Sequence, residues 1–256
     1  MCVFGHFVFN LTLTLVKRKF INLRLDYPQT RGGKRTHIPD GILTWQWIIV
    51  WFVIATIFVI IGARMIVKKR KENPSVMSIL ALMGAAVFII SVWHIPVAVA
   101  GSSGHPTGTG LAAIVIGPFA TVVITVIALF FQVFLAHGGL TTLGANTVSM
   151  GIVGAFSGYA TYWVARKLHA SYWLAAGMGG FVGDLLTYAT TALQLALSQG
   201  TALSQSPDYI LPYFTLYMME FSFVQIPIAI IEFAFTAITI QYIVNHKPEI
   251  LKWWHK

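Results

Sequence analysis

Long, uninterrupted apolar blocks constrain this chain more than any other feature of its sequence. Apolar residues make up 57% of the 256 residues, and only 10% are charged, whereas a typical soluble domain has about 25% charged residues. A helix that crosses a bilayer needs about 20 mostly apolar residues, and blocks of this kind recur along most of the chain. The sequence therefore predicts an all-α, polytopic membrane protein.

Seven membrane-spanning segments are expected. The third is short, and Gly117-Pro118 breaks the chain directly after it, so a continuous run through that break is the alternative. The last segment is long enough to tilt or to project beyond the bilayer. The segments are Thr44–Val67, Met77–Val97, Gly108–Ile116, Phe119–Leu135, Val148–Ala165, Tyr172–Leu197 and Tyr209–Val244.

The basic residues orient these segments, because Lys and Arg concentrate in cytoplasmic loops. With residue 36 outside and seven crossings, all ten Lys and Arg residues after position 35 fall on the cytoplasmic side, whereas six crossings would place Arg166 and Lys167 outside. We therefore expect a plasma-membrane protein whose spanning domain starts outside and ends in the cytoplasm. The net charge of +9 is explained by these loops. Aromatic residues do not interleave with a basic stripe, so no nucleic-acid surface is predicted.

Residues 1–35 differ from the rest of the chain. An apolar stretch, Val3–Val16, precedes seven Lys and Arg residues, which reverses the order of charge and apolar region in a signal peptide. The stretch is also short for a span. We treat 1–35 as a basic leader that we expect the mature chain to lack, and 36–256 as the transmembrane domain. The single cysteine, Cys2, excludes internal disulfides and a cysteine-based zinc site.

The predicted topology gathers four histidines on the external side: His37, His94, His105 and His137. Imidazole binds first-row divalent ions from cobalt to zinc. The outer loops contain no Lys or Arg and are rich in glycine, which lets a backbone approach a ligand closely. We interpret the cluster as a metal-capture site. Histidines bonded to helix-end carbonyls, with glycines that only form turns, are the structural alternative.

Three acidic residues lie inside the predicted spans: Asp184, Glu220 and Glu232. An ionisable group at membrane depth is costly and usually faces the protein interior. An ion path, a partner contact and an internally hydrogen-bonded role remain open, with the structural role favoured for Glu232. The pairs Gly154/Gly158 and Gly179/Gly183 predict close helix packing, more within this chain than against a partner.

Three motifs resemble a known family. THIPDGIL at 36–43 is similar to the MHIPDG amino terminus of the CbiM/NikM family. GSSGHPTGTGLAAIVIGP at 101–118 and HGGLTTLGANTVSMGIVG at 137–154 are similar to its second and third signatures. The order and spacing agree, and the resemblance extends from residue 36 to about 245. Members are substrate-binding S components of energy-coupling factor importers for cobalt and nickel.

The resemblance implies one Co²⁺ or Ni²⁺ held by nitrogen ligands. Carried over, these are the nitrogen of Thr36, the amide and imidazole of His37, and His105. His94 and His137, from the external histidine cluster, are the candidates for supporting or alternative ligands. This sequence departs from the pattern because Thr36 replaces the initiator Met and 35 residues precede it. If they remain attached, position 36 has no terminal amine.

These observations predict a transport subunit and no enzyme. The chain has no GxxxxGK[ST] phosphate loop, so uptake against a gradient would need an energising partner or an ion gradient. The resemblance implies cytoplasmic ATPase subunits, a transmembrane coupling subunit and a small accessory membrane protein as partners. We expect Co²⁺ import for cobalamin synthesis, with Ni²⁺ as the alternative and no permanent cofactor. A membrane enzyme would need acids in the outer loops, where only Asp208 follows Asp40. A metal-binding module without transport is the other rival.

Overall fold

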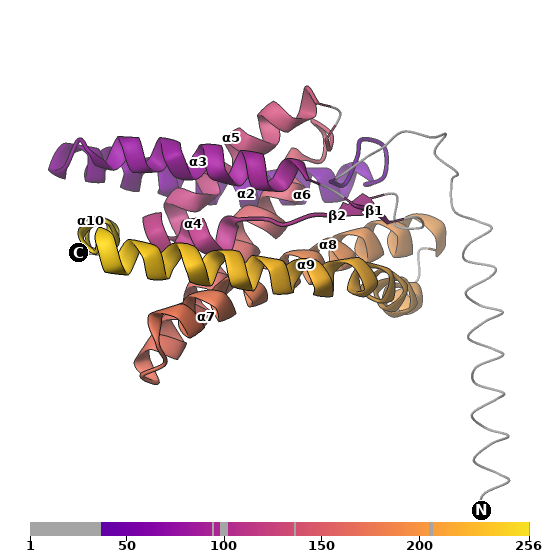
Figure 1. Cartoon of the computed structure of the whole chain (residues 1–256). Helices are drawn as coiled ribbons and strands as arrows, with labels where there is room; N and C mark the ends of the chain where they lie inside the picture. Colours follow the sequence, from indigo (N-terminus) through magenta and orange to yellow (C-terminus); the bar gives the residue numbers. More distant parts are fainter. Residues whose placement is uncertain (1–36, 94, 98–101, 136, 205–206, 256) are drawn as a thin grey trace, which may run out of the picture. The chain divides into compact units, whose positions relative to one another are not determined.

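The computed structural model describes residues 37–93, 95–97, 102–135, 137–204 and 207–255, which belong to one compact unit, Lys34–Lys256. Helices dominate this unit (Figure 1). The helices are α2 (Trp45–Glu72), α3 (Val76–Val92), α4 (Thr109–Ile116), α5 (Pro118–Val133), α6 (Leu143–Asn146), the π-helical η1 (Thr147–Gly154), α7 (Ala155–Lys167), α8 (Tyr172–Ser204), the 3₁₀ turn η2 (Pro207–Tyr209), α9 (Ile210–His246) and α10 (Glu249–His255).

The second predicted span requires a correction. Its helix ends at Val92, and Ile95–Val97 forms a strand, β1, paired antiparallel with β2, Ser102–Gly104. Pro96 explains the change, because proline has no N–H and disfavours helical geometry in the residue before it. The described part of the chain is mainly helical, as predicted, and carries one short two-stranded hairpin in addition.

Other boundaries differ from the sequence prediction as well. Helix α2 continues to Glu72 and α8 to Ser204, beyond the predicted ends at Val67 and Leu197. The fifth helical segment begins at Leu143 rather than Val148, and passes through α6 and η1 before α7. Gly144, Asn146 and Thr147 hid this beginning from an apolar-block criterion. The terminal helix α10 was not predicted, since its seven residues lie outside any long apolar run.

The predicted break between the third and fourth segments is confirmed. Gly117 has a φ of 77°, a conformation that glycine tolerates and other residues rarely adopt, and Pro118 is the first residue of α5. All eight residues of α4 are buried. At about 1.5 Å per residue α4 is roughly 12 Å long, too short to cross a bilayer by itself.

Several helices present apolar surface outward. Two helices of the described part, α2 and α9, are long and apolar enough to cross a membrane. Large apolar side chains lie exposed along α2, among them Trp45, Ile49, Val53 and Ile57. Exposure of such an apolar surface to water is unfavourable, whereas the hydrocarbon core of a bilayer accommodates it. The number of crossings and their direction stay predictions.

Figure 1 shows where the basic helix ends lie within this unit. The C-terminal ends of α2, α7 and α9 lie toward one end of the bundle, whereas the β1–β2 hairpin and α6 lie toward the other. The C-terminal ends of α2 and α7 carry basic residues: Lys69, Arg70 and Lys71 close α2, and Arg166 and Lys167 close α7. This separation agrees with the orientation that the charges predict.

Glycines bring α4, α7 and α8 into backbone contact. A Cβ on Gly158 would lie 2.8 Å from the Gly179 carbonyl oxygen and 3.0 Å from the Gly110 Cα. A Cβ on Gly183 would lie 2.8 Å from the Gly154 carbonyl oxygen. The two predicted glycine pairs therefore face each other within this chain, as small residues at helix contacts do.

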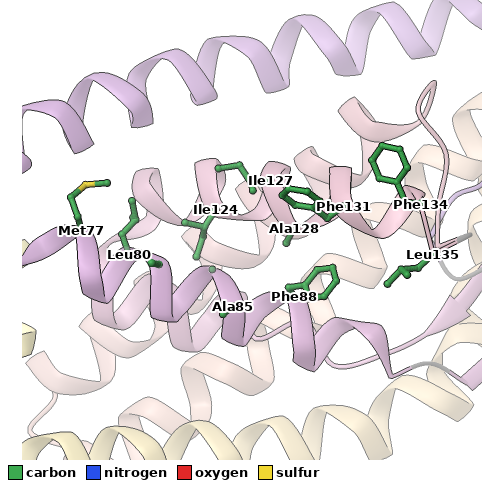
Figure 2. A pocket seen from close by; sticks show the side chains of 12 residues that line it. Met77, Leu80, Ala85, Phe88, Ile124, Ile127, Ala128, Phe131, Phe134 and Leu135 are labelled. Carbon is green, nitrogen blue, oxygen red and sulfur yellow. The ribbon is translucent and has the colours of Figure 1, made fainter.

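An apolar cavity of about 760 Å³ opens between α3 and α5. Figure 2 shows its lining side chains, which come from both helices. None of the lining residues is charged or polar; they are Met77, Leu80, Ala81, Gly84, Ala85, Phe88, Ile124, Ile127, Ala128, Phe131, Phe134 and Leu135. This cavity offers no ligand to a cation.

Candidate metal site

Two predicted ligands, His37 and His105, meet inside the bundle. His37 Nδ1 lies 3.1 Å from His105 Nε2, and the two rings are nearly perpendicular, with centroids 4.5 Å apart. Both side chains are buried, with 6% and 2% of their surfaces exposed. Residues separated by 68 positions thus direct one ring nitrogen each at a common point.

Hydrogen bonds on the far side of each ring determine which nitrogen carries the proton. His105 Nδ1 lies 2.9 Å from the Pro106 carbonyl oxygen, and His37 Nε2 lies 2.7 Å from Gln132 Oε1. Both oxygens only accept, so both outer nitrogens donate. The two facing nitrogens, His37 Nδ1 and His105 Nε2, lie at hydrogen-bond distance, so one proton shared between them, or a metal ion in its place, joins the two rings.

The orientation of the Gln132 amide is fixed in turn. Its Nε2 donates to Ser91 Oγ at 2.6 Å and to the Phe88 carbonyl oxygen at 3.3 Å. Because the carbonyl cannot donate, the amide nitrogen must face α3 and the amide oxygen must face His37. Gln132 is fully buried, so this orientation is maintained by α3 and α5 together.

Two converging ring nitrogens suit a small cation. With metal–nitrogen bonds of about 2.0–2.1 Å, as for zinc, nitrogens 3.1 Å apart subtend an angle of roughly 100° at the metal. The cavity beside the rings measures about 10 Å³, roughly the size of one water. It is lined by His37, Ile38, Ser103, His105, Asn146, Ser149, Met150, Thr187, Tyr188 and Thr191.

The His37 loop is attached to the segment 138–146. Ile38 N donates to Asn146 Oδ1 at 3.2 Å, and Thr142 Oγ1 donates to the Ile38 carbonyl oxygen at 2.5 Å. Gly138, with a φ of 86°, would place a Cβ 3.1 Å from His37 Cβ. Gly138 therefore forms the turn and also lets the segment 138–146 approach the His37 loop closely.

The backbone of His105 is held by α8 and α9. Its N–H donates to Tyr188 Oη at 2.8 Å, and its carbonyl oxygen accepts from Gln225 Nε2 at 3.1 Å. Tyr188 Oη also lies 3.2 Å from the Ser103 carbonyl oxygen. The two histidines therefore depend on different helices for their positions.

The remaining sequence candidates have different outcomes. Thr36 and His94 lie outside the described residues. His137 does not line the cavity, and its Nδ1 lies 2.6 Å from the Leu135 carbonyl oxygen, so its role as a supporting ligand stays a prediction. Within the described part of the chain no three His, Cys, Asp or Glu residues gather as a metal site. His37 and His105 are the two histidines that line the small cavity.

The acidic residues of the spans do not line the histidine cavity. Glu232 accepts hydrogen bonds from Thr107 N at 2.8 Å, Thr107 Oγ1 at 2.9 Å and Gly108 N at 2.8 Å. These donors begin α4, so Glu232 has the structural role that the sequence favoured. Asp184 accepts a hydrogen bond from Gln225 at 2.5 Å.

Sequence reasoning missed several residues around the histidines, chiefly Gln132, Asn146 and Tyr188. Gln132 and Gln225 stand inside apolar spans, and a polar residue in a span usually faces the protein interior. A polar residue within an apolar span could therefore have identified both glutamines as residues that face the protein interior. Nothing in the sequence indicates that Tyr188 would reach a loop 83 positions away.

The fold and the histidine pair define a class: a helical membrane protein with a buried nitrogen site suited to a transition metal. A family model described as "Cobalt uptake substrate-specific transmembrane region" matches residues 37–250. The chain therefore belongs to the CbiM family, as its three motifs predict.

Individual relatives support the same family. The cobalt transport protein CbiM of Sorangium cellulosum is 41% identical over 219 residues, which is 84% of this chain and 94% of that protein. The cobalt transport protein CbiM of Geobacter sulfurreducens is 42% identical over 216 residues, 84% of this chain and 61% of that longer protein.

A solved structure agrees as well. A crystal structure of a transition metal transporter superposes with a TM-score of 0.72 at 26% identity, covering 85% of this chain and 97% of the other. The fold of this chain is therefore that of a transition metal transporter.

Proposed function

We propose that this chain is the substrate-capture component of an energy-coupling factor importer for Co²⁺ in the plasma membrane. The observation that carries the proposal is the convergence of the buried ring nitrogens His37 Nδ1 and His105 Nε2, 3.1 Å apart. Nitrogen ligands suit first-row ions such as Co²⁺. The names of the relatives favour cobalt over nickel, and cobalamin synthesis is the use that we infer for the metal.

The ligand set that we propose comprises Thr36 nitrogen, the His37 amide and imidazole, and the His105 imidazole. Adjacent nitrogens of residues 36 and 37 would form fused chelate rings around the metal, which raises affinity by preorganisation. A terminal amine at Thr36 requires that residues 1–35 be absent from the mature chain. This requirement fits the leader's seven positive charges, which would otherwise lie outside, against the charge rule.

Uptake against a gradient needs a source of energy. The chain has no phosphate-binding loop, so we propose cytoplasmic ATPases, a transmembrane coupling subunit and a small accessory membrane protein as its partners. The chain itself is then no enzyme and holds no permanent cofactor.

Uptake of radioactive cobalt tests this function. We expect cells that produce the chain with its partner subunits to accumulate ⁵⁷Co, and cells that produce the chain alone to accumulate little. His105→Ala should abolish the accumulation. Accumulation that persists in His105→Ala cells would contradict the proposed site, and tight Co²⁺ binding without any accumulation would favour a binding module.

A further inference from the structure

The apolar cavity between α3 and α5 has the size and the lining of a ligand site. Its volume of about 760 Å³ lies within the roughly 300–1,000 Å³ that is typical of such sites. All of its lining residues are apolar, and none of them also lines the histidine cavity. The lining side chains extend along both helices (Figure 2), so the cavity is a groove that suits an elongated apolar ligand.

Small residues give this groove its depth. Ala81, Gly84 and Ala85 line it from α3, and their spacing of three and four residues places them on one face of that helix. Ala128 lines it from α5. Phe131, with 56% of its surface exposed, lies on the same helix at the open side. In a bilayer the groove is therefore open to the hydrocarbon of the lipids.

The volume of the groove favours an acyl chain over a partner helix. A helix as long as α5, about 24 Å long and about 10 Å wide, would occupy roughly 1,900 Å³. The groove provides less than half of that volume. A single extended acyl chain is much thinner than a helix and can lie entirely within the groove.

One end of the groove lies beside the basic end of α2. Met77 lines that end, and Leu135 lines the opposite end (Figure 2). Only the turn 73–75 separates α2 from α3. Within this turn Asn73 N donates a hydrogen bond to the Lys69 carbonyl oxygen at 2.9 Å, which keeps the end of α2 close to the start of α3.

This end of α2 carries four consecutive basic residues: Lys68, Lys69, Arg70 and Lys71. Lys69 lies 3.5 Å from Glu72. The other three side chains are exposed and form no ion pair with the residues that the structure describes. The opposite end of the groove has no comparable cluster, because residues 72–165 contain no Lys or Arg. Clusters of this kind directly after a spanning helix are typical of binding to anionic lipids.

We propose that one anionic phospholipid binds at this place, with an acyl chain in the α3–α5 groove and its phosphate at the basic end of α2. The groove accounts for the chain, and the cations account for the charge of the headgroup. A groove without cations would not select a headgroup, and cations without a groove would not hold a single lipid. The site is separate from the histidine pair, so this inference does not depend on metal transport.

Native mass spectrometry of the full chain in detergent tests the headgroup, with phosphatidylglycerol and phosphatidylcholine of identical acyl chains as probes. The first phosphatidylglycerol should bind at least about tenfold more tightly than the first phosphatidylcholine, because each nearby Lys or Arg attracts an anionic lipid. Arg70→Gln/Lys71→Gln should remove most of this preference. Arg166→Gln/Lys167→Gln changes the Arg-Lys pair that closes α7 and should retain it. Equal affinities for the two lipids, or a preference that survives Arg70→Gln/Lys71→Gln, overturns the proposal.

A substitution that fills the groove tests the position of the acyl chain. Ala85→Trp should weaken phosphatidylglycerol binding by about tenfold, since overfilling a packed apolar site is unfavourable. Leu82→Trp is the control, because Leu82 lies on the same helix, is 62% exposed and does not line the groove. Circular dichroism should show equal helix content in both variants. Unchanged phosphatidylglycerol affinity in Ala85→Trp overturns the proposal, and if that variant instead loses its partner subunits on purification, the groove binds a partner helix.

Discussion

The two histidines are held by groups that only accept hydrogen bonds at their outer nitrogens. The Pro106 carbonyl and the Gln132 amide oxygen orient the rings so that the inner nitrogens face each other, 3.1 Å apart. The protein itself therefore sets the direction of both rings, which is the preorganisation expected of a capture site.

The first residue-level prediction concerns His105. His105→Ala should weaken Co²⁺ binding by at least about 100-fold, more than loss of a supporting partner does, and leave the helical circular dichroism unchanged. Calorimetric titration of detergent-purified protein measures this. His246→Ala is the control, because His246 is exposed on α9 and bonds to the Tyr242 carbonyl within its own helix. Equal affinities for wild type and His105→Ala would exclude His105 as a ligand.

The second prediction concerns Gln132. Gln132→Leu preserves most of the side-chain volume but removes the acceptor for His37 Nε2–H. We expect a loss of about 10–100-fold in Co²⁺ affinity, the usual cost of losing a group that orients a ligand. Nitrogen NMR of the histidine ring should show His37 losing its preference for the Nε2–H tautomer. Gln241→Leu, on the exposed side of α9, is the control, and unchanged affinity in Gln132→Leu would show that the amide does not orient the ring.

At the level of elements, backbone contact among α4, α7 and α8 explains why Gly110, Gly158 and Gly179 lie where they do. Gly158→Leu should lower the thermal stability of the detergent-solubilised protein, because the new side chain would meet the Gly179 carbonyl and Gly110 Cα at 2.8 Å and 3.0 Å from its Cβ. Overpacking of this kind costs about 1–3 kcal/mol, occasionally more. Gly84→Ala is the matched control, since its nearest contact would lie at an ordinary 3.6 Å from Ile124. Equal unfolding temperatures for Gly158→Leu and wild type would refute the contact.

The sequence was sufficient to predict those elements whose limits depend on the length of an apolar run or on a proline or glycine. The break at Gly117-Pro118 and the two facing glycine pairs follow directly from local chemistry. The early end of α3 at Val92 did not, because apolar residues continue through Val97 and only Pro96 signals a strand. Gln132 and Tyr188 could not be assigned to the histidines, since their contacts join residues 95 and 83 positions apart. Such contacts depend on how the helices pack, which local patterns do not specify.

The membrane orientation of the whole molecule can be tested by labelling. We predict that residue 140 is external and residue 168 cytoplasmic, because this places every basic loop of the transmembrane domain inside. Leu140→Cys, in a chain without Cys2, should react with an impermeant thiol reagent in intact cells, and Leu168→Cys only after lysis. Both positions are exposed, at 52% and 75%, whereas Ser103 is buried at 1% and would be a poor reporter. Labelling of Leu168→Cys but not Leu140→Cys in intact cells would invert the orientation.

The terminal amine is the remaining test, because it joins the leader, the His37 loop and the capture site. Two forms of the chain differ by one residue: one begins at Thr36, and the other carries a single glycine before Thr36. The added glycine converts the Thr36 amine to an amide, which must lose a proton before it can bind a metal and is a far weaker ligand near neutral pH. We therefore expect Co²⁺ affinity to fall by at least about 100-fold, beyond the usual cost of a lost orienting group. Ile38 and Asp40 keep their bonds to Asn146, Thr141 and Thr142 in both forms, so the fold should not change. Equal affinities for the two forms would exclude the amine and leave His94 and His137 as the candidates for the missing ligand.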